Sequence, residues 1–167
     1  MIALRGVQYL EVGAMAVRME LARILIRELN DYQLIELREV APNQNPEDEP
    51  GKQSFSQVEG GRSFPIVIGL PEAQAIERRL KGIVVKRPQT HDLMSNILTE
   101  LGAKLESITI NDLVDHTFYA QLNVRDSTGK QRNIDARPSD AIAMGIANNV
   151  PILVAEHVLE SAQSDMP

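Results

Sequence analysis

The sequence predicts an α+β fold, in which helices pack on a mixed and largely antiparallel sheet within a single domain. Apolar and polar residues alternate strictly over residues 117–124, as expected for a half-buried strand. The turn signal at residues 126–129 joins this strand to a second strand around Ile134, so the two are antiparallel. Pro138 then begins a helix directly after the second strand, so hairpins and strand-to-helix steps occur in one chain.

Length and composition agree with one folded domain. The 167 residues are enough to bury about 70% of the unfolded surface. We place the domain at residues 18–160, with an N-terminal extension at residues 1–17 and a C-terminal tail at residues 161–167. Cys is absent, which excludes disulfides, thiolate metal sites and cysteine nucleophiles. No signal pattern and no long apolar run occur, so we expect a cytoplasmic protein with no membrane segment.

The first part of the chain contains one ambiguous segment, one strand and one loop. Residues 19–29 fit a helical stripe and equally a strand that leads into a turn. Residues 34–40 predict a strand. Residues 41–62 contain three Pro, three Gly and an acidic cluster, which predict a long loop insertion and not a second domain.

The middle of the chain predicts a strand, two helices and another strand. A compact apolar run at residues 64–68 indicates a strand, and Pro71 stands at the first position of the helix that follows. A second helix has Thr90 as its expected N-cap and an apolar stripe after it. Residues 105–112 predict the next strand, and residues 150–155 predict a buried strand near the C-terminus.

The chain is organised around the strand-to-helix step at residues 133–142. A strand ends at Asp135, and Pro138 fixes a backbone angle that suits the first helical turn. Ser139 and Asp140 are residue types that accept hydrogen bonds from the free N–H groups of that turn. The helix start at residues 137–140 therefore resembles the one at residues 90–92, since both carry charged and hydroxyl side chains.

Such helix starts have two interpretations. Charged and hydroxyl groups at a helix N-terminus bind an anion or a metal, and the same groups also serve as plain caps, which most helices need. The net charge of −6 argues against indiscriminate binding of nucleic acid. A run of cations nevertheless indicates either a local basic patch or a solvated surface. Its members are Arg78, Arg79, Lys81, Lys86 and Arg87.

Six stretches occur in consistent order across residues 18–160. They are FPIVIGLPEA at 64–73, RPQTHDL at 87–93, INDL at 110–113, HTFYA at 116–120, IDARPSDAI at 134–142 and the segment at 151–159. Together they resemble the bifunctional nuclease domain family. The insertion at residues 41–62 is longer than the turn usual in that family, and Gln89 replaces an apolar residue, but every polar motif residue is in place.

The resemblance implies strands for residues 19–29, a homodimer and a cleft lined by the polar motifs. Family members with an assigned activity cleave DNA and RNA, so the resemblance implies a nuclease with nucleic acid as substrate. Hydrolysis of a phosphodiester requires an activated water, stabilisation of charge on the phosphate and help for the leaving oxygen. Carboxylates that hold Mg²⁺ or Mn²⁺ supply the first and third of these, and Arg supplies the second.

The residues expected to carry this chemistry follow from those requirements. The expected catalytic residues are His91, Asp92, Asp135, Arg137 and Asp140. The expected substrate-binding residues are Thr90, Tyr119, Ser139 and Arg87, and the hypothetical ligands of Mg²⁺ or Mn²⁺ are Asp135, Asp140, Asp112 and Glu72.

Structural roles remain open for the same side chains. Acids in first helical turns complement the helix dipole without any ligand, which applies to Glu72, Asp92 and Asp140. Asp135 and Arg137 also suit an ion pair in the interior. The alternative function is a non-catalytic binding or regulatory module that holds an anionic ligand or a partner in the same cleft.

Overall fold

Eight strands and four helices are found in the part of the chain that the computed structural model describes, which is residues 16–27, 29–43 and 54–164. The strands are β1 (Ala16–Leu25), β2 (Gln33–Pro42), β3 (Phe55–Gln57), β4 (Ser63–Ile68), β5 (Lys104–Val114), β6 (Thr117–Arg125), β7 (Gln131–Ala136) and β8 (Ile152–Ala155). The helices are α1 (Leu70–Leu80), α2 (Thr90–Glu100), α3 (Pro138–Ala147) and α4 (Glu156–Ser164).

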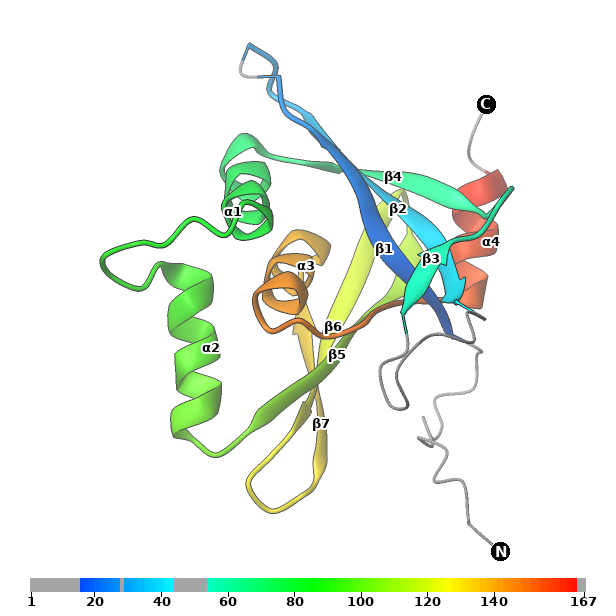
Figure 1. Cartoon of the computed structure of the whole chain (residues 1–167). Coiled ribbons are helices and arrows are strands. Elements are labelled where there is room, and N and C mark those ends of the chain that lie inside the picture. The colour runs from blue at the N-terminus through cyan, green and yellow to red at the C-terminus, as the bar shows by residue number, and fades with distance from the viewer. Residues whose placement is uncertain (1–15, 28, 44–53, 165–167) are drawn as a thin grey trace, which may run out of the picture.

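The strands form one mixed sheet in the order β3-β2-β1-β8-β5-β6-β7, and β4 also pairs with β2 (Figure 1). Among the described strands, β5 and β8 are parallel and every other pair is antiparallel. The predicted α+β class with a largely antiparallel sheet is therefore confirmed.

The register of β6 and β7 decides which side chains face the core. Leu122 lies opposite Ile134, and Gln121 lies opposite Asp135. Because successive side chains of a strand alternate, these two rows point to opposite faces of the sheet. Leu122 is buried in the core, so Asp135 lies on the face away from the core.

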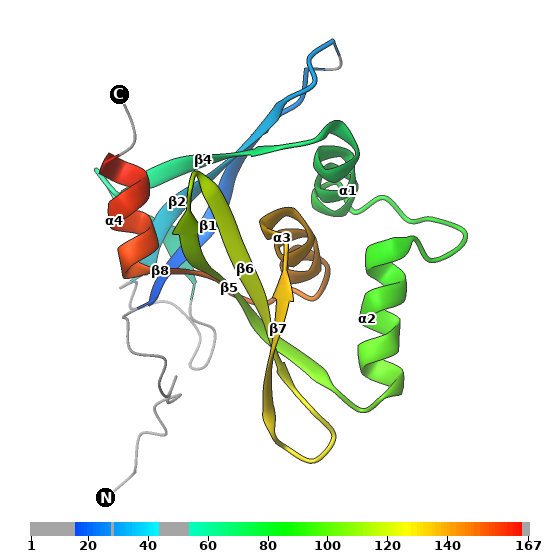
Figure 2. The ribbon, with the colours of Figure 1, turned by 180° about the vertical axis from the view of Figure 1, so that it is seen from behind.

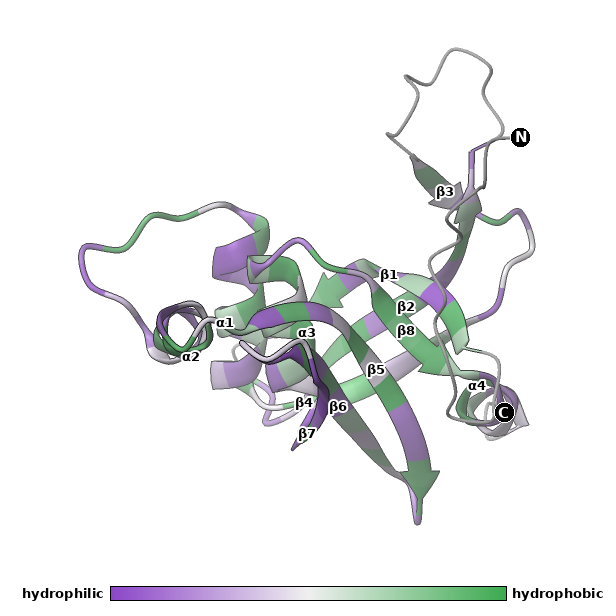
Figure 3. Cartoon of the chain, turned by 90° about the horizontal axis from the view of Figure 1, so that it is seen from below, coloured by the Kyte–Doolittle hydropathy of each residue, from purple (hydrophilic) through white to green (hydrophobic). Residues whose placement is uncertain are grey.

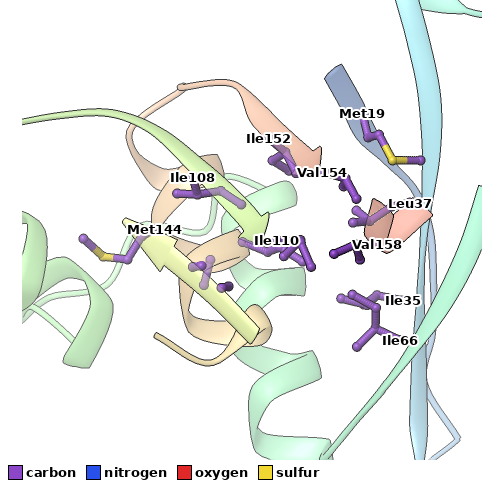
Figure 4. Packing of buried hydrophobic residues seen from close by; sticks show 14 of the residues in the cluster. Met19, Ile35, Leu37, Ile66, Ile108, Ile110, Met144, Ile152, Val154 and Val158 are labelled. Atoms are coloured by element: carbon purple, nitrogen blue, oxygen red, sulfur yellow. The ribbon is translucent and has the colours of Figure 1, made fainter. Parts of the chain in front are cut away.

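Helix α3 packs directly on the inner face of the sheet. A Cβ atom at Gly145 would lie 3.3 Å from Cγ1 of Ile108, so this glycine allows the close approach of α3 to β5. Ile142 and Met144 of α3 are fully buried. Figure 4 shows Met144 and Ile108 in the same apolar cluster as Val158 of α4. The core is thus an aliphatic layer between the sheet and the helices.

The helices are unequally buried. Helices α1, α2 and α3 gather on one side of the molecule, and α4 lies at the other end (Figures 1 and 2). Helix α2 is the outermost of the three, and none of its described residues is buried (Figure 3). Its apolar side chains at Leu93, Ile97 and Leu101 are half-exposed or more. Met94 and Leu98 pack against the core while partly buried, so α2 buries less apolar surface there than α3 does.

Two local expectations differ from the structure. Phe55–Gln57, predicted as part of a loop, form β3 and pair with the end of β2. A strand of three residues carries too little alternation to be detected in a sequence. The N-cap of α2 is Gln89 and not Thr90, because Oδ2 of Asp92 accepts a hydrogen bond from the N–H of Gln89 at 2.9 Å.

The ambiguous segment at residues 19–29 belongs to β1 as far as Leu25, and so it is a strand. The described elements begin before residue 18 and end after residue 160. Residues 1–15 of the predicted extension, 44–53 of the predicted insertion and 165–167 of the predicted tail lie outside the described residues. Within the described ranges, no helix has the length and apolar character needed to cross a bilayer.

Replacing Ile142 with Ala should lower the free energy of unfolding by about 2–5 kcal/mol, because it leaves a cavity between α3 and the sheet. Urea denaturation followed by circular dichroism measures this loss. The matched control is Ile97→Ala on α2, where the side chain is 48% exposed. It should change the free energy by only about 0.5 kcal/mol. Equal losses in the two variants would contradict the assignment of α3 to the core.

Candidate functional site

An open cleft of about 690 Å³ lies where α1, α2 and α3 come together. One face of α1 forms one wall, and the starts of α2 and α3 form the others. The lining residues are Pro71, Glu72, Ala75 and Arg78 from α1, Pro88, Gln89, Thr90, His91 and Leu93 from the start of α2, and Arg137 and Asp140 from the start of α3. A smaller hollow beside β1, β2 and β4 is lined by Arg23 and Glu36, which form an ion pair with each other.

Asp140 is the centre of the polar contacts in this cleft. Its Oδ1 lies 2.9 Å from Nε2 of His91, and its Oδ2 accepts a hydrogen bond from Nε of Arg137 at 2.8 Å. The side chain of His91 is 12% exposed and that of Asp140 is 27% exposed. The carboxylate therefore holds an imidazole and a guanidinium in place while it remains accessible from the cleft.

Arg137 extends these contacts to α1. Its Nη1 donates a hydrogen bond to Oε1 of Glu72 at 3.2 Å, and its side chain is 65% exposed. Its Nη2 has no hydrogen-bond partner among the described residues. The contacts from His91 through Asp140 and Arg137 to Glu72 thus join the three helices and leave one donor of Arg137 for a ligand.

Hydrogen bonds within the cleft favour the charged forms of Asp140 and Arg137. Burial raises the pKa of Asp140, but hydrogen bonds from Arg137 and His91 outweigh burial and hold that pKa below its usual value. The hydrogen bond to Asp140, with a smaller contribution from Glu72, raises the pKa of Arg137. The Asp140 carboxylate and the Arg137 guanidinium are consequently both charged at neutral pH.

Local sequence explains why the two acids reach the cleft. Pro71 and Pro138 start α1 and α3, which puts Glu72 and Asp140 in first helical turns. Neither helix has a side-chain hydrogen bond at its N-cap. The capping interpretation is therefore wrong for Asp140, whose oxygens bond to other side chains.

Asp92 has the structural role that the sequence left open. Its Oδ2 accepts the hydrogen bond from the Gln89 backbone, and its Oδ1 accepts one from Nη2 of Arg79 at 3.0 Å. Arg79 in turn donates to the carbonyl of Ala75 at 2.8 Å. Both oxygens of Asp92 thus fasten the start of α2 to α1, and Asp92 is absent from the residues that line the cleft.

The four expected substrate-binding residues differ in their exposure and in whether they line the cleft. Thr90 is exposed and lines the cleft. Arg87 is exposed and immediately precedes Pro88, at the edge of the cleft. Ser139 is buried behind the start of α3, with 7% of its surface exposed. Tyr119 is 44% exposed on β6 and does not line the cleft.

Two expected carboxylates lie outside the cleft. Asp112 on β5 is opposite Tyr119, and its Oδ1 lies 3.6 Å from Nε2 of His157. Asp135 is exposed on the outer face of β7. The interpretation of Asp135 and Arg137 as an interior ion pair is wrong, because both side chains are exposed and Arg137 bonds to other carboxylates.

Two carboxylates are the donors that the cleft offers to a divalent ion. Within residues 16–27, 29–43 and 54–164, no group of three or more His, Asp and Glu side chains is placed to hold a metal. The cleft does contain two carboxylates, Glu72 and Asp140. Mg²⁺ is commonly bound by one or two carboxylates together with waters and substrate phosphates, so these two residues would suffice.

Residues near the cleft also include cations whose roles the sequence did not reveal. Arg78 lines the cleft, and Arg79 fastens Asp92. Both belong to the basic run of the sequence, but the run alone does not separate a ligand-facing cation from a structural one. Arg78 is three positions from Ala75 and seven from Pro71, so it shares their helix face in the cleft, but nothing in the sequence alone marks that face as the one lining a cleft.

The pKa of Asp140 predicts an acid-dependent part of the stability. A carboxylate whose pKa is lower in the folded state contributes stability above its unfolded pKa, about 3.9, and loses it as the pH falls through the folded value. The difference in unfolding free energy between the wild type and Asp140→Asn should therefore shrink as the pH falls from about 5 through the lowered folded-state pKa of Asp140. Chemical denaturation at each pH measures it, and a constant difference over that range would contradict the assignment.

Comparison with known proteins identifies the family of this chain. A family model described as the bifunctional nuclease domain matches residues 55–167. Two uncharacterised proteins of Mycobacterium tuberculosis are each 42% identical to the chain over 106 residues, which is 64% of this chain and 62% of the relative. Bifunctional nuclease 2 of Oryza sativa subsp. japonica is 25% identical over 114 residues, which is 65% of this chain and 35% of that protein.

The matches cover less than two thirds of the length of each of these relatives. The family model, in contrast, covers more than half of the chain and includes every residue that lines the cleft. The sequence motifs and the family model agree, and this chain therefore belongs to the bifunctional nuclease domain family.

Proposed function

We propose that this protein hydrolyses phosphodiester bonds of DNA or RNA in the cleft between α1, α2 and α3. The observation that carries the proposal is the contact of Asp140 with both His91 and Arg137 in an open cleft. Imidazole, carboxylate and guanidinium are the groups that phosphodiester hydrolysis uses for proton transfer and charge stabilisation. Family membership supports nucleic acid as the substrate.

His91 is the general base of the proposed reaction. The Asp140 carboxylate accepts a hydrogen bond from Nε2–H of His91, and in this tautomer Nδ1 is the nitrogen that can take a proton. Nδ1 takes a proton from a water molecule while the water oxygen forms a bond to phosphorus. The bond between phosphorus and the leaving oxygen then breaks, and the imidazolium or a second water returns a proton to that oxygen.

Arg137 stabilises the negative charge on the phosphate. Two of its nitrogens hold Asp140 and Glu72, so the guanidinium is fixed before substrate arrives. Its remaining Nη2 donates to a phosphate oxygen. Preorganisation of this kind lowers the barrier because no reorientation is needed during the reaction.

A divalent ion, Mg²⁺ or Mn²⁺, is part of the proposal. Glu72 and Asp140 are the cleft residues that would hold it. When bound, such an ion neutralises phosphate charge and lowers the pKa of a coordinated water. Arg137 and His91 keep their roles of binding phosphate and accepting a proton.

Homodimer formation, which the family resemblance implies, also remains a proposal. The exposed apolar side chains of Leu93, Ile97 and Leu101 recur every fourth residue on one side of α2. An apolar stripe of this kind is consistent with contact with a second protein surface.

Replacing His91 with Gln should lower the rate of cleavage of a single-stranded oligonucleotide by about 100-fold to 10,000-fold, because the general base is lost. The matched control is His157→Gln, since His157 is exposed and lies outside the cleft. Cleavage is measured with equal amounts of each purified protein. Equal cleavage by all three proteins would assign the activity to a contaminant.

The same experiment separates the enzyme from the alternative, a non-catalytic binding module. A module of that kind would bind the oligonucleotide and raise the melting temperature without cleaving it. Binding without turnover by the wild type, with either metal present, would therefore contradict the proposed hydrolysis.

Replacing Glu72 with Gln should weaken metal binding, because one of the two carboxylates is lost. Mn²⁺ is expected to raise the melting temperature of the wild type, and this rise should be smaller in Glu72→Gln. Glu77→Gln on the same helix is the matched control, since Glu77 pairs with Lys81 and does not line the cleft. Equal rises in all three proteins would place the metal elsewhere.

A further inference from the structure

Arg78 is a cation of the cleft that lacks an acidic partner. It lines the wall formed by α1, and its Nε is buried without a hydrogen-bond partner. Its guanidinium makes no hydrogen bond or salt bridge with the residues that the structure describes. The unpaired guanidinium of this cleft-lining arginine therefore offers donors to an acceptor that enters the cleft.

Two other arginines show that Arg78 is different. The Nε atoms of Arg38 and Arg79 are also buried without a partner. Nη2 of Arg79, however, bonds to Asp92, and Nη2 of Arg38 bonds to Glu36. Arg78 has no such carboxylate, so its positive charge is available to an anion.

Arg78 also lies apart from the acids of the cleft. It follows Glu72 by six positions on α1, which corresponds to about 9 Å along the helix axis. Glu72 and Asp140 are both held by Arg137. One end of the cleft therefore has two acids and an arginine, and the other has an arginine alone.

We propose that Arg78 binds a phosphate group of a nucleic acid strand, next to the phosphate that lies at Arg137. The identity of the ligand rests on the proposed function, while the availability of Arg78 rests on its own contacts. Two separate arginines along one cleft suit a strand with consecutive phosphates and not an ester with a single phosphate. The substrate class is thus a polynucleotide strand.

The cleft is compatible with such a strand in other respects. Its volume of about 690 Å³ lies in the range of roughly 300–1,000 Å³ that holds small organic ligands, so a nucleotide unit fits. Ala75 and Leu93 supply apolar surface between the polar groups. A sugar or base can rest there while the phosphates contact the arginines.

The test compares Arg78→Gln with Lys81→Gln. Lys81 follows α1 directly, and its exposed side chain pairs with Glu77 outside the cleft, so both variants remove one positive charge from the same region. Binding of a single-stranded oligonucleotide is measured by fluorescence anisotropy in EDTA at several salt concentrations. Hydrolysis of the oligonucleotide and of bis(4-nitrophenyl) phosphate, which has one phosphodiester, is measured with Mn²⁺.

Arg78→Gln should weaken oligonucleotide binding roughly tenfold, because a charge-assisted hydrogen bond is lost. The slope of log K against log salt should decrease in magnitude by about 0.7, the value for one phosphate of a single strand. KM for the oligonucleotide should rise, while hydrolysis of bis(4-nitrophenyl) phosphate stays unchanged. Lys81→Gln should alter none of these quantities, and Arg78→Lys should keep the salt slope of the wild type.

Two results would overturn the proposal. The first is an equal effect of Arg78→Gln and Lys81→Gln on oligonucleotide binding. The second is an equal loss for the oligonucleotide and for bis(4-nitrophenyl) phosphate, which would place Arg78 at the reacting phosphate or in the fold. Binding that depends on Arg78 without cleavage by the wild type would support the role of Arg78 and contradict only the proposed hydrolysis.

Discussion

The cleft depends on the carboxylate of Asp140, which binds the imidazole of His91 from α2 and the guanidinium of Arg137 at the start of its own helix. The partner residue His91 is 49 positions away in sequence, on a helix with no buried residue. Met94 and Leu98 attach α2 to the core by partial burial, and polar contacts hold the start of the helix. Asp92 bonds to Arg79 of α1, and Asn148 donates a hydrogen bond to Ser95 at 3.0 Å. Together with the contact of His91, these bonds determine where the imidazole lies.

Charge balance explains how an acidic protein can offer a site to an anion. The chain has a net charge of −6, which opposes general binding of nucleic acid. Within the cleft, the charges of Glu72 and Asp140 are offset by those of Arg78 and Arg137. Three helix starts also direct free N–H groups and partial positive charge toward this region. Attraction of an anion is therefore local, which favours entry into the cleft over adsorption elsewhere.

The sequence predicts those features that depend on near neighbours. The alternation at residues 117–124, the turn after it and Pro138 were sufficient to predict the hairpin and α3 correctly. Contacts between segments that are distant in sequence could not be predicted in the same way. Asp135 and Asp140 are five positions apart, yet the register of β7 turns Asp135 to the outer face while α3 carries Asp140 into the cleft. Arg78 and Arg79 look alike in sequence, and only the placement of Asp92 shows which of them is paired.

The structure separates the part that maintains the fold from the part that forms the cleft. Helix α3 belongs to both, since Ile142 and Met144 are buried in the core and Asp140 faces the other helices. Helix α2 belongs mainly to the cleft. Because α2 has no fully buried residue and contacts the core through the partly buried Met94 and Leu98, moving its start exposes less apolar surface than moving α3. An anion bound at the free Nη2 of Arg137 leaves the bonds of Arg137 to Asp140 and Glu72 in place. The phosphate-binding guanidinium and the start of α2 are therefore joined through one carboxylate, that of Asp140.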